Sequence, residues 1–121
     1  MSREGLELAV GWERFVGDLL DRTSKFPKAL RYVLGQRLDE AALDVAEQLV
    51  EAQYTRGERR ARSLREINLR LSRIRLLVRL AHARRCLDPR AYEHCSREID
   101  AFGRGIGAWL KQLQGGLDGD G

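Results

Sequence analysis

The apolar residues of this chain recur at spacings of three and four, which is the period of amphipathic α-helices. Four such patterns follow one another along the 121 residues. They predict helices at about residues 4–24, 27–54, 58–87 and 89–113. Runs of β-branched residues are absent and the connections are short, so we predict an all-α protein. Its expected architecture is an antiparallel, up-down four-helix bundle over residues 1–114.

Proline, glycine and aspartate mark the boundaries between these patterns. Phe26 precedes Pro27 and is therefore biased away from the helical region, and Pro27 can open the second helix. Gly57 is the expected left-handed cap before the third helix. Asp88 as N-cap, with Pro89 at the first helical position, predicts the start of the fourth. The glycine- and aspartate-rich tail at 115–121 is expected to be flexible.

The third helix carries two apolar rows instead of one. The first has heptad-like spacing and predicts a core seam; it comprises Leu64, Ile67, Leu71, Ile74, Val78 and Ala81. The second lies roughly opposite at about 100° per residue and comprises Leu69, Leu76, Leu80, Ala83 and Leu87. One buried face would be enough for a monomeric bundle. Two faces indicate that this helix is covered on one side by its own chain and on the other by something else.

Positive charge is concentrated on the same helix. From Arg56 to Arg90 the chain has 12 basic and 3 acidic residues, a net charge of +9, whereas the whole chain carries only +4. Arginine supplies 19 of the 22 basic residues, which favours bidentate partners such as phosphate or carboxylate. Some arginines should pair with acids of a neighbouring helix, namely Asp44, Glu47 and Glu51. For the cluster as a whole, we expect an anionic partner.

The predicted fourth helix has glycine at every second position near its end, at Gly103, Gly105 and Gly107. Three glycines inside a helix cost about 2–3 kcal/mol relative to alanine. We therefore expect another backbone or a bulky side chain to approach closely there.

Catalytic chemistry has little support in the sequence. A nucleophile needs a base and an orienting group, but the chain has only two histidines. One alternative remains open, in which His82, Cys86, His94 and Cys95 meet at one end of the bundle and bind zinc. Helical cysteines more often act as small apolar residues. We predict a non-enzyme with no catalytic residue, no metal and no cofactor.

The opening residues lack the layout of a signal peptide, and no run of about 20 apolar residues is present. We therefore expect a cytoplasmic protein without a membrane partner. Aromatic residues make up only 7% of the chain, which gives little support to base stacking. Any binding of nucleic acid should depend mostly on phosphate contacts.

Several strings, read together, resemble the Avd family, the accessory variability determinants of diversity-generating retroelements, within the bacterial four-helix-bundle protein group. The resemblance covers roughly Phe15 to Gln112. Its strings are Phe26-Pro27-Lys28, Arg31-Tyr32, Leu34-Gly35-Gln36-Arg37, Arg75-Leu76-Leu77-Val78-Arg79-Leu80-Ala81 and Gly103-Arg104-Gly105-Ile106-Gly107-Ala108-Trp109-Leu110. The last is the most specific, although it has Gly105 where the family usually has a larger apolar residue.

This resemblance implies a homopentameric barrel with a basic surface, which binds the element's reverse transcriptase as well as RNA and DNA. Such proteins support the mutagenic copying of a template repeat into a target gene. The binding residues implied by motif match are Arg75, Arg79 and Arg104, followed by Lys28, Arg31 and Arg37. Arg84 and Arg85 join them on the argument from charge alone.

A second family remains open as an alternative. This is the related four-helix-bundle group associated with ribosomal RNA insertions, an interaction protein with no polymerase partner. Only the first family predicts an adjacent reverse-transcriptase gene and a pair of repeats, so the genomic neighbourhood distinguishes the two.

Overall fold

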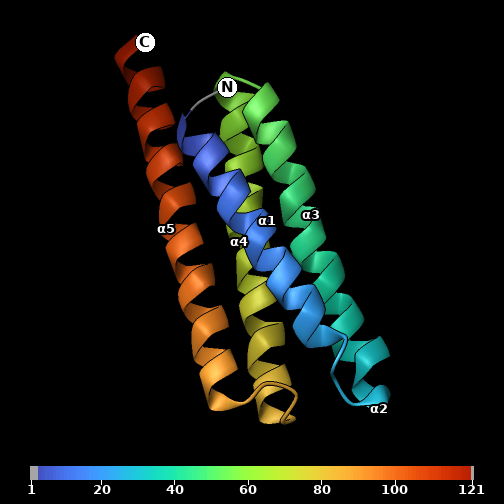
Figure 1. The fold of residues 1–121 in the computed structure, drawn as a ribbon. Helices are drawn as coiled ribbons and strands as arrows, with labels where there is room; N and C mark the ends of the chain where they lie inside the picture. The colour runs from blue at the N-terminus through green and yellow to red at the C-terminus, as the bar shows by residue number, and fades with distance from the viewer. Residues whose placement is uncertain (1–2, 121) are drawn as a thin grey trace.

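The computed structural model describes the backbone of residues 3–120 and the side chains of residues 3–116. Long helices pack side by side as a single bundle, and both chain ends lie at the same end of it (Figure 1). The elements are α1 (Arg3–Thr23), α2 (Lys28–Leu30), the π-helix η1 (Arg31–Gly35), α3 (Gln36–Tyr54), α4 (Gly57–Ala83) and α5 (Pro89–Asp120). No strand occurs between residues 3 and 120, so the predicted all-α, four-helix fold is confirmed.

The long helices form a ring in which α1 packs against α3 and α5, and α4 packs against the same two helices. Neighbouring helices run antiparallel (Figure 1). Accordingly, Gln53 near the end of α3 donates a hydrogen bond to the carbonyl of Gly5 at the start of α1 (3.0 Å). The α1–α5 contact is the sparsest of the four neighbouring pairs. The bundle is therefore tight around α4 and looser between its first and last helices.

Trp12 anchors the core from α1. Its side chain is 1% exposed, and its indole N–H donates a hydrogen bond to the carbonyl of Ala42 on α3 (2.9 Å). The ring also contacts Phe15 and, across the bundle, Phe102 on α5, at centroid distances of 4.8 and 4.4 Å. The polar atom of a buried tryptophan needs such a partner. This residue therefore ties three of the four helices together.

The predicted second helix is not continuous. A short α2 is followed by one π-helical turn, in which the N–H of Gln36 bonds to the carbonyl of Arg31, and only then does α3 begin. A π-helical turn contains one residue more than an α-helical turn, so it shifts the positions that face the core. As a result Leu34 and Gly35 both face the core, whereas Tyr32 and Val33 are exposed. The spacing of apolar residues alone could not predict this insertion.

The third predicted helix ends at Ala83, four residues before the expected Leu87. Arg85 has a φ of +62°, and the N–H of Cys86 bonds to the carbonyl of Ala81 (2.8 Å). This is a Schellman ending, with arginine in the left-handed position that glycine usually occupies. Because the sequence has no glycine there, it gave no sign of the helix end.

The sequence predicted that Gly57 and Asp88 mark the starts of α4 and α5, and that the last helix ends near residue 113. Gly57 has the expected left-handed conformation (φ +57°), although it forms the first residue of α4. The carboxylate of Asp88 accepts a hydrogen bond from the N–H of Ala91 (2.7 Å), which confirms it as the N-cap of α5. The helix then continues to Asp120, beyond the expected end at 113 and into the predicted tail. Residue 121 lies outside the described part.

The alternating glycines of α5 have different surroundings. A Cβ at Gly105 would lie 2.4 Å from Leu8 Cδ2, and one at Gly103 would lie 3.1 Å from Arg75 Nη2. The expected close approach is therefore confirmed at these two positions. At Gly107 a Cβ would meet nothing within 4 Å, so the prediction was wrong there.

Candidate nucleic-acid interface

The inner face of α4 is the core seam that the sequence predicts. All six of its residues are at most 1% exposed; they are Leu64, Ile67, Leu71, Ile74, Val78 and Ala81. Their packing against α3 and α5 fixes the rotation of α4 about its own axis. The opposite side of the helix must therefore face away from the core.

Three leucines form what we call the outer row on that opposite side. Leu69, Leu76 and Leu80 are 60%, 47% and 42% exposed. Ala83 continues this row and is also exposed. Leu87 was wrongly included, because it follows the end of α4 and is buried in the core. Three large apolar side chains in line on one helix are more than the scattered exposure expected of a surface.

Four of the α4 arginines form ion pairs. Arg62 and Arg65 pair with Glu66 and Glu58 of the same helix. Arg70 reaches Asp44 on α3 (3.4 Å), and Arg75 reaches Asp100 on α5 (3.1 Å). The pairing expected with Asp44 is therefore confirmed, but within the described residues neither Glu47 nor Glu51 pairs with an arginine. These pairs are exposed, so each contributes at most about 1 kcal/mol.

Arg60 has a structural role instead. Its guanidinium donates hydrogen bonds to the carbonyls of Ala52 (2.8 Å) and Gln53 (3.1 Å) and lies 5.2 Å from the ring centre of Trp109. It therefore satisfies carbonyls at the end of α3, where a cation is favoured by the helix dipole. This cation is not available to a polyanion.

The remaining α4 arginines are free. Arg59, Arg73 and Arg79 are exposed, and none forms an ion pair or hydrogen bond within the described residues. Arg73 and Arg79 flank the outer row on either side, by their position on the helix. The apolar row and unpartnered cations thus share one surface of the molecule.

The eight predicted binding residues divide into three groups. Arg75 and Arg79 line a hollow of about 210 Å³ between α4 and α5, together with Asp100. Arg104 lies one helical turn beyond Asp100, is exposed, and has no partner within the described part of the chain. These three residues therefore belong to a common α4–α5 face.

The second group lies at the end of the bundle away from the termini. Figure 1 shows α2 and the chain that follows it at that end, as well as the turn between α4 and α5; the first segment carries Lys28 and Arg31, and the second carries Arg84 and Arg85. Arg31 also donates a hydrogen bond to the carbonyl of Phe26 (3.3 Å). All four residues are exposed. Residues more than 50 positions apart in the sequence therefore form one basic end.

Arg37 is separate from both groups. It lines a hollow of about 160 Å³ between α3 and α4, which also contains Arg70, Arg73 and Asp44. Arg73 was missed as a candidate, although its charge was visible in the sequence. Its lack of a partner depends on which acids lie nearby in the fold, and the sequence does not show that.

The four residues that could have bound zinc, His82, Cys86, His94 and Cys95, do not face one another as metal ligands would. The His82 ring stacks on Tyr92 at 4.3 Å, and its Nδ1 lies 3.0 Å from the carbonyl oxygen of Leu87. His94 faces Asp18 at 3.7 Å. Burial raises the pKa of both cysteine thiols, Cys86 and Cys95, which favours their protonated form. In the described residues, no three such side chains gather where they could hold a metal ion.

Fold and surface together define an all-α, four-helix-bundle protein whose arginine-rich helix presents apolar side chains and unpartnered cations outward. The model of the bAvd-like family matches residues 8–113, and the chain belongs to that family. This is the first of the two families considered from the sequence, and it is a family of Avd-type accessory proteins. Comparisons with curated proteins and with solved structures found no match. Among the described helices, none is long and apolar enough to cross a membrane.

Proposed function

We propose that this chain is the non-catalytic accessory protein of a diversity-generating retroelement. It binds the element's reverse transcriptase and the backbones of RNA and DNA, and it assembles through its apolar outer surface into a homopentamer. In this role it supports mutagenic copying of a template repeat. Membership of the bAvd-like family over residues 8–113 is the observation that carries this proposal.

The charge distribution supports an interaction with phosphate. Arg79 and Arg104 have no partner within the described residues, and Arg75 is held only by the exposed Asp100. A phosphate can therefore bind at this face without breaking a buried ion pair, and counterion release from nucleic acid favours the contact. The binding is expected to show little sequence preference, because phosphate contacts do not read bases.

Charge reversal tests the proposed contact. The double variant Arg75→Glu and Arg104→Glu, at two residues of this face that do not flank the outer row, should lose most RNA binding at low salt and keep the oligomeric state of the wild type. The slope of log K against log salt is negative, and each phosphate contact that is lost should reduce its magnitude by about 0.7 to 0.9. Filter binding across a salt series and light scattering measure the two quantities.

A matched control is the double reversal Arg3→Glu and Arg97→Glu. These arginines are 91% and 76% exposed and form only intrahelical pairs, so the variant has the same net charge as the test variant. It should bind RNA more tightly than the test variant does. Equal binding by both would show that net charge alone matters and would defeat the proposed α4–α5 site.

The polymerase contact is tested by co-purification with the reverse transcriptase encoded beside this chain. The proposal expects a stable complex between the two. A genomic neighbourhood with no such gene, or a polymerase that does not associate with this protein, would contradict this part of the function.

A further inference from the structure

A groove follows the outside of the bundle between α1 and α5, the two neighbours with the sparsest packing. Three hollows occur along it. The first, of about 290 Å³, includes His94 and Glu98. The second, of about 200 Å³, includes Ala101 and Phe102. The third, of about 270 Å³, includes Trp109.

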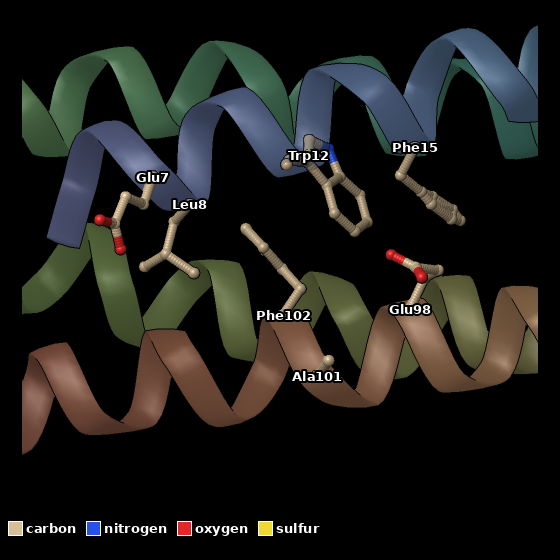
Figure 2. A pocket seen from close by; sticks show the side chains of 8 residues that line it. Glu7, Leu8, Trp12, Phe15, Glu98, Ala101 and Phe102 are labelled. Atoms are coloured by element: carbon tan, nitrogen blue, oxygen red, sulfur yellow. The ribbon is translucent and has the colours of Figure 1, made fainter.

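The floor of this groove is apolar. Figure 2 shows Leu8 and Trp12 directed from α1 toward α5, with Phe102 directed back between them. At the rim stand Gly11 and Ala101, which have little or no side chain. Large apolar groups thus lie below the surface and small ones at its edge, so side chains of another helix can enter.

The rim is mostly acidic. Glu4, Glu7, Asp18 and Glu98 border the hollows, against the basic residues Arg14 and His94. Glu4 and Glu98 form no ion pair within the described residues. The α4 helix has the opposite character, with eight arginines against two glutamates. The groove and α4 are therefore complementary in charge.

The spacings also agree. The α5 residues that line the first and second hollows are centred about four positions apart, which is roughly 6 Å along the helix. Those that line the second and third hollows are centred about eight positions apart, or roughly 12 Å. In the outer row, Leu80 and Leu76 are four residues apart and Leu76 and Leu69 seven, or roughly 6 and 10 Å. Three leucines and three hollows can therefore engage together.

We propose that the outer row of one copy inserts into the α1–α5 groove of a second copy. This inference rests on the proposed self-association and specifies its interface. The outer row points away from the core of its own protomer, and α4 does not pack along α1. The row and the groove are different surfaces, so the contact is head to tail, and each added copy exposes a new row and a new groove until a ring closes.

Filling the groove tests the proposal without disturbing the fold. A Cβ added at Gly11 meets nothing within 4 Å, so Gly11→Leu should fold and should also favour the helix. Its side chain would occupy the first two hollows, which Gly11 borders. Gly17→Leu is the matched control, since Gly17 is equally open and lines none of the three hollows. We expect the Gly11 variant to be a 13.8 kDa monomer and the control to assemble as the wild type does.

Mixing two variants tests the head-to-tail arrangement. Leu76→Glu removes the row and keeps the groove, whereas Gly11→Leu blocks the groove and keeps the row. Each should be monomeric alone, with a melting temperature showing that it is folded. Their mixture has one intact row and one intact groove, so it should form a dimer and nothing larger, as measured by sedimentation velocity.

Several results would overturn the interface. They are a Gly11→Leu protein that assembles normally, a control that dissociates as readily as the test variant, and a mixture that stays monomeric. If another protein's helix occupied the groove, both variants would keep the wild-type mass. A monomeric wild type is a different failure, because it removes the self-association itself.

Discussion

The two faces of α4 have the same kind of apolar spacing and opposite surroundings. On the inner face Leu71 and Ile74 are completely buried, while on the outer face Leu69 and Leu76 are about half exposed. Burial of the inner leucines stabilises the protomer, by roughly 2 kcal/mol for each side chain. The outer leucines are only partly buried and contribute less to the folding of the single chain, so the difference shows which face of α4 serves mainly to hold the protomer together.

The largest expected effect contrasts one leucine from each face. Leu71→Ala should lower the free energy of unfolding by about 3 kcal/mol, because it leaves a cavity in the core. Leu76→Ala, on the outer face, should change it by less than about 0.5 kcal/mol when compared in the monomeric Gly11→Leu background. Urea denaturation measures both. Similar losses at the two positions would mean that α4 has no distinct outer face.

Two adjacent arginines provide the next contrast. Arg60→Ala should cost about 2 kcal/mol, since it removes hydrogen bonds to two carbonyls of α3 and the contact with Trp109. Arg59→Ala removes a free cation and should leave stability within about 0.5 kcal/mol. Thermal unfolding of the two variants compares them. A larger loss for the Arg59 variant would contradict the assignment of Arg60 as the structural arginine.

A smaller effect is expected where α4 ends. Arg85 holds the left-handed conformation without being glycine, so Arg85→Gly should stabilise the protein by about 1 kcal/mol. Arg84→Gly is a suitable control, since that residue has a φ of −91° and gains nothing from glycine. A higher melting temperature is expected for the first variant only. If both variants melted alike, the turn would not be strained.

The smallest expected effect is a pH dependence of the free energy of unfolding, which comes from Asp39 on α3. Burial raises the pKa of Asp39 above its ordinary 3.8, although a hydrogen bond from Thr23 (2.7 Å) opposes this. The folded state then holds the proton more tightly than the unfolded chain, so this residue's contribution to stability falls as pH rises just above 3.8 and stays low at neutral pH. Asp39→Asn replaces the carboxyl with an amide that does not titrate, so it removes this pH dependence.

The wild type should therefore lose stability relative to the Asp39→Asn variant as the pH rises from 3.8 through the raised pKa of Asp39. Urea midpoints measured between about pH 4 and neutrality test this. A difference that is constant over the interval, or that changes in the opposite direction, would contradict the raised pKa.

The sequence allowed the four-helix fold and the seam of α4 to be predicted, because a helix that buries one face must repeat its apolar residues with the helical period. It also predicted the exposed side of α4 from Leu69, Leu76 and Leu80. The π-helical turn over Arg31–Gly35 was missed because the spacing of apolar residues does not show an inserted residue, and the left-handed Arg85 was missed because no glycine marks it. Of the interhelical arginine pairs, the one with Asp44 was expected and the one between Arg75 and Asp100 was not, because Asp100 reaches Arg75 only through the packing of α5 on α4.

The predicted binding residues show the same limit of what the sequence can reveal. Arg75, Arg79 and Arg104 were expected together and do share a face, whereas Arg84 and Arg85 lie at the same end of the bundle as Lys28 only because the connections that carry them both lie there. The α1–α5 groove has no signal in the sequence beyond the small residues Gly11, Ala101 and Gly105. Its hollows depend on how far apart two helices settle, and that distance follows from the whole core.

The most direct test is the mass of the purified wild-type chain in solution by multi-angle light scattering. If the outer row of α4 is an assembly surface, the mass should be that of several copies, with five copies of the 13.8 kDa chain giving about 69 kDa. A single species of 13.8 kDa over the whole concentration range would show that these leucines remain in water and would contradict the assembly.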